Sequence, residues 1–172
     1  MCSFIGIISD KKALLDRVEN EQEGMFSKLR SRGPDIQTFK RVNDKILLGG
    51  FVLSITGESA QPVLKDGACL LWNGEIYNCP DEYESDTQFL IDYFNNGGLE
   101  QLYETSQPAP GKIVTSLDGE FVINYIKDGL LHIITDDFFT KPMCYYLTDD
   151  TLIFSSYESG IQEVVPGAQV VH

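Results

Sequence analysis

Short apolar runs separated by turn-forming residues divide the chain into strands with a few helices between them. The predicted strands cover residues 4–8, 46–55, 68–72, 120–126, 130–135, 143–148 and 151–155. The last four form two hairpins across short polar turns. The segment 164–171 is expected to add an edge strand. This pattern predicts an α+β fold in which antiparallel sheets form a layered sandwich.

Helical spacing of apolar residues predicts two helices. From Lys11 to Arg30 the apolar side chains form one stripe, and Gly33 with Pro34 ends the helix. A second helix is expected from Asp86 to about Asn95, with Ser85 as its N-cap. Residues 107–111, with two prolines and a glycine, predict a loop within one domain.

The strand at 68–72 is expected to end abruptly at Asn73-Gly74-Glu75. Asn-Gly is a common turn dipeptide, but no matching strand follows it at once. A simple hairpin is therefore doubtful, and the sequence leaves the role of this turn open.

Size and charge narrow the classes of function. The 172 residues are 42% hydrophobic, which suits a single globular domain spanning 1–172. A formal net charge of -13 disfavours binding to nucleic acids or to anionic membrane surfaces. No apolar stretch is long enough to span a bilayer, and charged residues soon after the first strand argue against a secretory signal.

The cysteines indicate reduced thiols, as in a cytoplasmic protein. None of the four forms a Cys-x-x-Cys pair, and neither His132 nor His172 is grouped with them, so a zinc site and a disulfide framework are both disfavoured. Cys69 and Cys144 lie in apolar runs and are expected to be small core residues.

Cys2 is different because it follows Met1 directly. Cysteine is small enough for the initiator methionine to be removed before it. Its α-amine, with a reference pKa of about 8, can then act as the base for its own thiol, whose reference pKa is about 8.5. One residue would supply nucleophile and base. The alternative is a buried structural cysteine, and position alone favours that interpretation.

Three further residues would complete an acyl-transfer site around such a nucleophile. The side-chain amide of Asn73 and the backbone N–H of Gly74 can stabilise a tetrahedral oxyanion, and glycine permits close approach of a substrate. The carboxylate of Asp86 can pair with a substrate ammonium group.

Motifs along nearly the whole chain resemble the glutamine-hydrolysing domain of class II glutamine amidotransferases, and within them the asparagine synthetase branch. The most specific is Asn-Gly-Glu-Ile-Tyr-Asn at 73–78, together with Arg-Gly-Pro-Asp at 32–35 and the N-terminal cysteine. The others are Leu-Ser-Ile at 53–55, Gln-Pro at 61–62, Ser-Asp-Thr at 85–87, Leu-Asp-Gly-Glu-Phe at 117–121, Lys-Pro at 141–142 and Phe-Ser-Ser at 154–156.

The resemblance implies an N-terminal-nucleophile hydrolase fold, a four-layer αββα sandwich of two antiparallel sheets between helical layers. It implies that Cys2 attacks the side-chain amide of glutamine, that ammonia leaves, and that water releases glutamate from a thioester. Asn73 and Gly74 would form the oxyanion hole. The implied substrate-binding residues are Leu53, Ser54, Ile55, Glu75 and Asp86. No metal and no cofactor is implied.

The sequence departs from the family at the substrate carboxylate. The family has an arginine immediately before Leu-Ser-Ile, and here that position is Val52. Valine donates no hydrogen bond to a carboxylate. Another cation such as Arg41 or Lys40 would have to replace it, the substrate would lack a free α-carboxylate, or the site would no longer hydrolyse glutamine. Phe139 and Thr135 also replace a family glycine and arginine.

The chain contains no Ser-Gly-Gly-x-Asp loop of an ATP pyrophosphatase, so no synthetase domain is expected in it. Three arrangements remain open: it supplies ammonia to a separate ATP-dependent synthetase partner, it acts alone, or it is an excised domain. A non-catalytic binding module that retains the fold is the rival interpretation, and Val52 is the reason for considering it.

Overall fold

The computed structural model describes residues 2–54, 59–105 and 117–172, with the backbone alone at 103–105. The predicted loop at 107–111 and the predicted site residue Ile55 lie outside these ranges. The strands are β1 (Ser3–Ser9), β2 (Ile36–Asn43), β3 (Ile46–Val52), β4 (Val63–Lys65), β5 (Ala68–Ile76), β6 (Gly119–Lys127), β7 (Leu130–Thr135), β8 (Cys144–Leu147) and β9 (Thr151–Ser155). The α-helices are α1 (Lys12–Glu21), α2 (Ser27–Arg32), α3 (Asp86–Tyr93), α4 (Leu99–Thr105) and α5 (Glu158–Val164).

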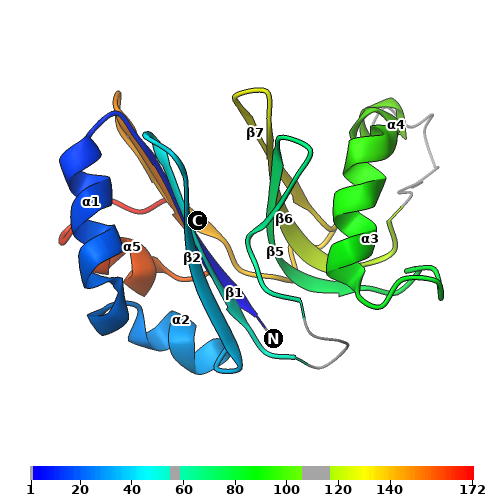
Figure 1. Cartoon of the computed structure of the whole chain (residues 1–172), viewed down its shortest axis with the longest axis horizontal. Helices are drawn as coiled ribbons and strands as arrows, with labels where there is room; N and C mark the ends of the chain where they lie inside the picture. The colour runs from blue at the N-terminus through cyan, green and yellow to red at the C-terminus, as the bar shows by residue number, and fades with distance from the viewer. Residues whose placement is uncertain (1, 55–58, 106–116) are drawn as a thin grey trace.

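The strands form two antiparallel sheets that pack face to face. One sheet has the order β2-β3-β1-β9-β8, and the other has the order β4-β5-β6-β7. Helices α1, α2 and α5 cover the outer face of the first sheet, and α3 and α4 lie on the outer side of the second (Figure 1). This arrangement confirms the predicted αββα sandwich. None of the helices in the described residues has the length and apolar character that a membrane span requires.

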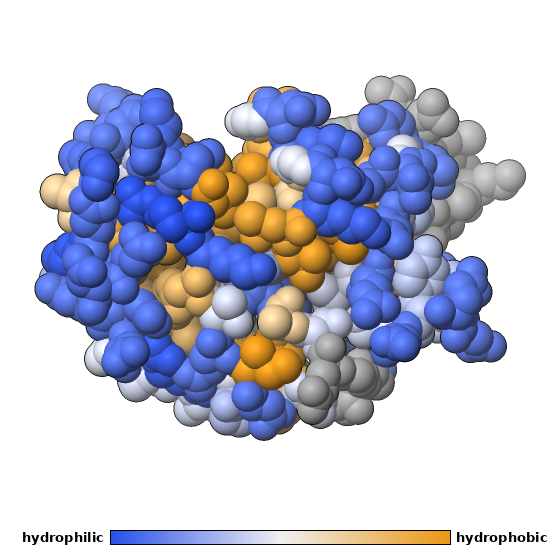
Figure 2. All heavy atoms as spheres, viewed as in Figure 1, coloured by the Kyte–Doolittle hydropathy of each residue, from blue (hydrophilic) through white to orange (hydrophobic). Residues whose placement is uncertain are grey.

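Three apolar clusters hold the four layers together. Two join each sheet to its helices. The third lies between the sheets and combines Phe4, Leu48, Leu71, Val122 and Phe154. Its rim is visible in Figure 2 as a band of apolar residues between hydrophilic flanks. Because strand side chains alternate between faces, this central cluster identifies which residues of each strand look toward the opposite sheet.

The single helix predicted from Lys11 to Arg30 is wrong, because the chain breaks between α1 and α2. A 3₁₀ turn spans Gln22–Gly24, and Phe26 adopts a left-handed conformation with φ of 64°. Phe26 is fully buried against Phe39 and Phe51, and its amide hydrogen bonds the Glu163 carboxylate. Tertiary packing thus overrides the helical periodicity at this point.

The abrupt end predicted for the strand at Asn73 is also wrong. β5 continues through Asn73-Gly74 to Ile76 and stays paired with β6 over its length. Sequence patterning missed the strands β2 and β4 and the helix α4. Of the segment 164–171, the first residue ends α5, and only Val171 forms a bridge, to Tyr145. Both predicted hairpins are confirmed.

The predictions for two core cysteines and for one helix cap are confirmed. Cys69 and Cys144 are both buried. Ser85 caps α3, since its Oγ accepts a hydrogen bond from the amide of Gln88. The second sheet ends on β7, where the side chains of Leu130 and Ile133 are exposed.

Candidate active site

Cys2 immediately precedes β1, and strand alternation places it on the face that looks toward the second sheet. Phe4, two residues on, belongs to the cluster between the sheets. Ser3 points the other way and donates its hydroxyl to the carbonyl of Leu29 in α2 at 2.8 Å. The Sγ atom of Cys2 lies 3.9 Å from the carbonyl oxygen of Leu53. The first residue of the Leu-Ser-Ile motif is therefore beside the candidate nucleophile.

Buried serines fix the start of β1. The amide of Phe4 donates to Ser156 Oγ at 3.0 Å, and Ser155 donates its hydroxyl to the carbonyl of Phe4 at 3.0 Å. Both serines are almost fully buried at the end of β9. These two serines of the Phe-Ser-Ser motif therefore fix the backbone that follows Cys2.

Asp35 links the Arg-Gly-Pro-Asp turn to the segment beside Cys2. Its carboxylate accepts a hydrogen bond from the amide of Ser54 at 2.8 Å, and its own amide donates to the carbonyl of Val52 at 3.1 Å. Burial raises the pKa of the Cys2 thiol, and the charge of Asp35 adds to this rise. Asp35 is a functional candidate that motif reading alone did not assign.

Asn73 and Gly74 lie near the end of β5, opposite Val122 and Phe121 of β6. Asn73 is buried and lies on the same face of β5 as Leu71, which belongs to the cluster between the sheets. It therefore looks toward the sheet that holds β1, and β1 lies against β5 across the sandwich. A Cβ on Gly74 would stand 2.2 Å from the carbonyl oxygen of Glu120, so only glycine fits there.

Five buried side-chain polar atoms have no hydrogen-bond partner among the described residues, and two of them, Asn73 Oδ1 and Ser54 Oγ, belong to the candidate site. A buried polar atom without a partner is costly, and such atoms are frequent at functional sites. Both belong to residues that the family resemblance places at the substrate. They are available for a ligand.

Two of the predicted substrate-binding residues, Asp86 and Glu75, carry carboxylates. Asp86 opens α3 and accepts a hydrogen bond from the amide of Ile76, the last residue of β5, at 2.9 Å. Glu75 is exposed, two residues after Asn73 on the same face of β5. Ile76 and the cap of α3 thus bring Asp86 next to the end of the strand that carries Asn73.

The residue at the family's arginine position is buried and apolar. Val52 is 5% exposed and, like Leu48, faces the layer between the sheets. Ser3 pairs with Phe51, so extending this register by one residue sets Val52 opposite Cys2. No cation therefore comes from this position, although it lies next to the candidate nucleophile.

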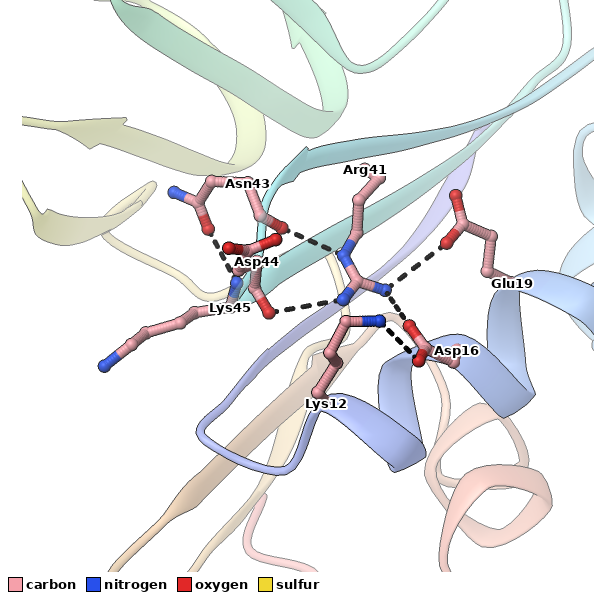
Figure 3. A network of polar contacts seen from close by, with 7 residues as sticks. All are labelled: Lys12, Asp16, Glu19, Arg41, Asn43, Asp44 and Lys45. Atoms are coloured by element: carbon pink, nitrogen blue, oxygen red, sulfur yellow. Dashed lines mark hydrogen bonds and ion pairs between the residues drawn. The ribbon is translucent and has the colours of Figure 1, made fainter.

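Arg41, one of the two cations considered as substitutes, is held elsewhere. Its guanidinium contacts Asp16 and Glu19 of α1 at 3.3 Å each, and it also donates to the carbonyls of Asn43 and Asp44 (Figure 3). These contacts place it on the helix side of the first sheet. Arg41 is therefore excluded as a partner for a substrate beside Cys2.

Lys40, the other candidate, sits too far along its strand. It pairs with Leu48, whereas Val52 pairs with Ile36. Four residues of β-strand separate these positions, which corresponds to about 13 Å. The charge of Lys40 acts on Cys69, in the middle of the sandwich. Lys40 therefore does not replace the missing arginine either.

The structure thus gathers Cys2, Leu53 and Ser54 at the joined ends of β1 and β3, and Asn73, Gly74, Glu75 and Asp86 at the end of β5. Within the described ranges, no three or more histidine, cysteine or acidic side chains are grouped as metal ligands. The chemistry that this set can perform is nucleophilic attack by a thiol with hydrogen-bond donors nearby.

Comparison with known proteins places the chain in a family. A solved structure of glutamine phosphoribosylpyrophosphate amidotransferase from Bacillus subtilis matches 99% of this chain and 44% of its own, with a TM-score of 0.52 and 16% identity. That likeness shows the N-terminal-nucleophile hydrolase fold. An asparagine synthetase domain-containing protein of Drosophila melanogaster is 44% identical over 70 residues, covering 37% of this chain and 12% of the relative.

The chain therefore spans less than half the length of both proteins. The profile of the glutamine amidotransferase domain, by contrast, matches it almost from end to end, over residues 1–170. The chain belongs to the glutamine amidotransferase domain family.

Proposed function

We propose that this domain hydrolyses the side-chain amide of glutamine or a related amide and releases ammonia, with Cys2 as the nucleophile. The observation that carries the proposal is the position of Cys2. It lies on the inner face of its sheet, 3.9 Å from the Leu53 carbonyl, while Asn73 and Gly74 approach from the opposing sheet. The family assignment supports the same chemistry.

The reaction begins after removal of Met1, which frees the α-amine of Cys2. This amine takes the thiol proton, and the thiolate attacks the carbonyl carbon of the amide. The side chain of Asn73 and the N–H of Gly74 stabilise the oxyanion. The carbon–nitrogen bond then breaks, and the protonated amine returns its proton to the leaving group, which departs as ammonia. Water attacks the thioester, which yields the carboxylate and regenerates the thiol.

We further propose that the ammonia serves an ATP-dependent synthetase unit. The Drosophila relative is described as containing an asparagine synthetase domain and is much longer than this chain. The domain itself lacks the nucleotide-binding loop of such an enzyme. The acceptor would then lie in a separate subunit or in further sequence of the same protein.

Two measurements test the hydrolysis. Intact mass spectrometry establishes whether Met1 is removed and whether a glutamine-analogue electrophile adds once, at Cys2. Ammonia release is then measured for the wild type and for Cys2→Ala, with Cys144→Ala as a matched control because that thiol is buried in the core. Activity should disappear only in Cys2→Ala. No ammonia release by wild-type protein lacking Met1, at millimolar amide substrate, would refute the proposal.

A non-catalytic binding module is the second candidate, favoured specifically by the buried Val52. It retains Met1, which blocks the α-amine, and binds an amide ligand without turnover. Retention of Met1 on the mature protein, with ligand binding by calorimetry, distinguishes it from the enzyme.

A further inference from the structure

Free glutamine carries two charges near its Cα atom, an ammonium and a carboxylate. Four bonds separate the amide carbon from the carboxylate carbon, so the two lie about 5 Å apart when the side chain is extended. A carboxylate buried without a cationic partner is costly. An amide held at Cys2 therefore requires a cation close to Cys2 if the substrate is free glutamine. This argument rests on the function proposed above.

The charges at this end of the sandwich are mostly negative. Asp35 bonds the segment beside Cys2, and Asp86 bonds the end of β5. Glu75 and Glu120 stand directly opposite each other on β5 and β6. These carboxylates suit a substrate ammonium group and oppose a second anion.

Two described cations lie at this end, and both have partners. Arg32, which precedes the Gly33 that packs against Val52, lies over the Tyr157 ring at 5.7 Å, and Lys141 is neutralised by Glu120. The Nζ atom of Lys141 lies 2.8 Å from the Glu120 carboxylate, and its side chain is only 12% exposed. Since Glu120 faces Glu75 across the strands, Lys141 offsets the repulsion between two acids. The three residues together carry a net charge of -1.

The remaining described lysines and arginines lie elsewhere, and Lys40 acts on Cys69 in the middle of the sandwich. On the helix side of the first sheet, Arg17 bonds the carbonyl of Val164, Lys28 lies over the Tyr157 ring, Arg30 lies over the Phe51 ring, and Arg41 pairs with the Asp16 carboxylate. At the far end or outer edge of the sheets lie Lys11 with Asp150, Lys12 with Asp16, Lys45 with Asp10, Lys65 with Asp92, and Lys127 at the end of β6. Lys112 lies outside the described residues.

From this charge distribution we infer that the substrate is a glutamine whose α-amino group is free and whose carboxyl group is in amide or peptide linkage, as in the N-terminal residue of a peptide. Asp86 and Glu75 face its ammonium group. Val52 contacts the uncharged end, where a peptide carbonyl replaces a carboxylate and requires no cation. The product is a peptide with N-terminal glutamate, together with one ammonia per water consumed.

The experiment compares substrates that differ in one charge each. L-Glutamine, L-glutaminyl-glycine and N-acetyl-L-glutamine are offered to the protein lacking Met1, and the product acid is quantified by mass spectrometry. We expect kcat/KM for glutaminyl-glycine to exceed that for glutamine by at least tenfold. N-acetyl-glutamine, which keeps the carboxylate and loses the ammonium, is expected to be the poorest of the three.

Val52→Arg reverses the preference if the reasoning is correct. A guanidinium beside Cys2 should shift the ratio of kcat/KM values at least tenfold toward free glutamine, whereas Val52→Met should leave that ratio unchanged. Arginine at a buried position can prevent folding. If Val52→Arg is unstable for this reason, the ratio of kcat/KM values of the wild-type protein alone tests the inference.

Lysine variants test for an overlooked carboxylate partner. Lys112→Gln and Lys141→Gln are expected to change the substrate ratio less than threefold. A selective rise in the KM for glutamine in either variant identifies a cation for the carboxylate and overturns the inference. Preference of the wild type for free glutamine also overturns it, but leaves the proposed hydrolysis intact. Turnover of none of the three amides contradicts both proposals.

Discussion

Replacing Asp136 with alanine should destabilise the domain substantially, because this buried carboxylate organises the turn after β7. It accepts hydrogen bonds from the amides of Phe121 at 3.0 Å and Phe138 at 2.9 Å, and from the amide and hydroxyl of Thr140. The turn also holds Phe139 at a φ of 53°, a left-handed conformation in which non-glycine residues are strained.

The expected magnitude follows from which donors lose their partner. The amide of Phe121 is buried in β6, so leaving it without an acceptor costs about 1–3 kcal/mol. The amides of Phe138 and Thr140 belong to exposed residues, where water can replace the carboxylate. A loss of about 2–4 kcal/mol in the free energy of unfolding is therefore expected, or about 4–16 °C in Tm for a domain of this size.

Urea unfolding as a function of pH provides the assay. Burial raises the pKa of the Asp136 carboxyl, but hydrogen bonds from Thr140, Phe121 and Phe138 together lower it below its usual value. The stabilisation is thus present above the unfolded-state pKa of about 3.9 and is lost as the pH falls through the lower folded-state value. The difference in the free energy of unfolding between the wild type and Asp136→Ala should therefore become smaller below pH 4.

Asp137→Ala is the matched control, since Asp137 is the exposed neighbour, and it should change stability by less than about 0.5 kcal/mol. If Asp136→Ala were no more destabilising than Asp137→Ala, or if the difference between the wild type and Asp136→Ala were the same at pH 7 and pH 3, the assigned role of the carboxylate would be incorrect.

Two further predictions concern the sheets. Burial, with the charge of Glu158, raises the pKa of the Cys144 thiol to about 11. Between pH 8 and pH 11 the free energy of unfolding of the wild type, measured in urea, should therefore fall by about 2 kcal/mol more than that of Cys144→Ala. Parallel plots of the free energy of unfolding against pH for the two proteins would contradict this. Gly74→Ala brings a Cβ within 2.2 Å of the Glu120 carbonyl oxygen, so it should lower the free energy of unfolding by about 1–3 kcal/mol and reduce ammonia release. Gly24→Ala, a control with open space around the glycine, should do neither. Equal changes in Tm for the two variants would count against the contact at Gly74.

Strands buried on both faces were predictable because their apolar runs are continuous. β1 and β9 lie in the interior of the five-stranded sheet, and their hydrophobic residues face both the helices and the second sheet. β2 and β4 are edge strands, with side chains that are half-buried or exposed, so their sequences lack that signal.

Local turn propensity misled the reading of Asn73-Gly74. The dipeptide predicts a turn, yet β6 pairs with β5 through both residues. The glycine is required there because the neighbouring strand approaches closely, not because the chain reverses. A single sequence cannot separate these two reasons, since both select the same residue.

In the candidate site, too, some features could be predicted from the sequence and others could not. Cys2, Asn73 and Asp86 could be singled out by residue type and motif, because each supplies chemistry that an amide hydrolase needs. The contact of Asp35 with Ser54, and the diversion of Arg41 to α1, depend on how distant segments pack. Those contacts decide the charge around the candidate site, and no local pattern encodes them.

The β7 edge strand has a consequence for handling the protein. Among the described residues β7 pairs with β6 alone, so its other edge, next to the exposed Leu130 and Ile133, is a template for pairing with another molecule. At neutral pH the net charge of -13 keeps molecules apart. Near the isoelectric point, about 4.4, or at high salt, that repulsion vanishes, so purification and crystallisation should stay at neutral pH and low ionic strength.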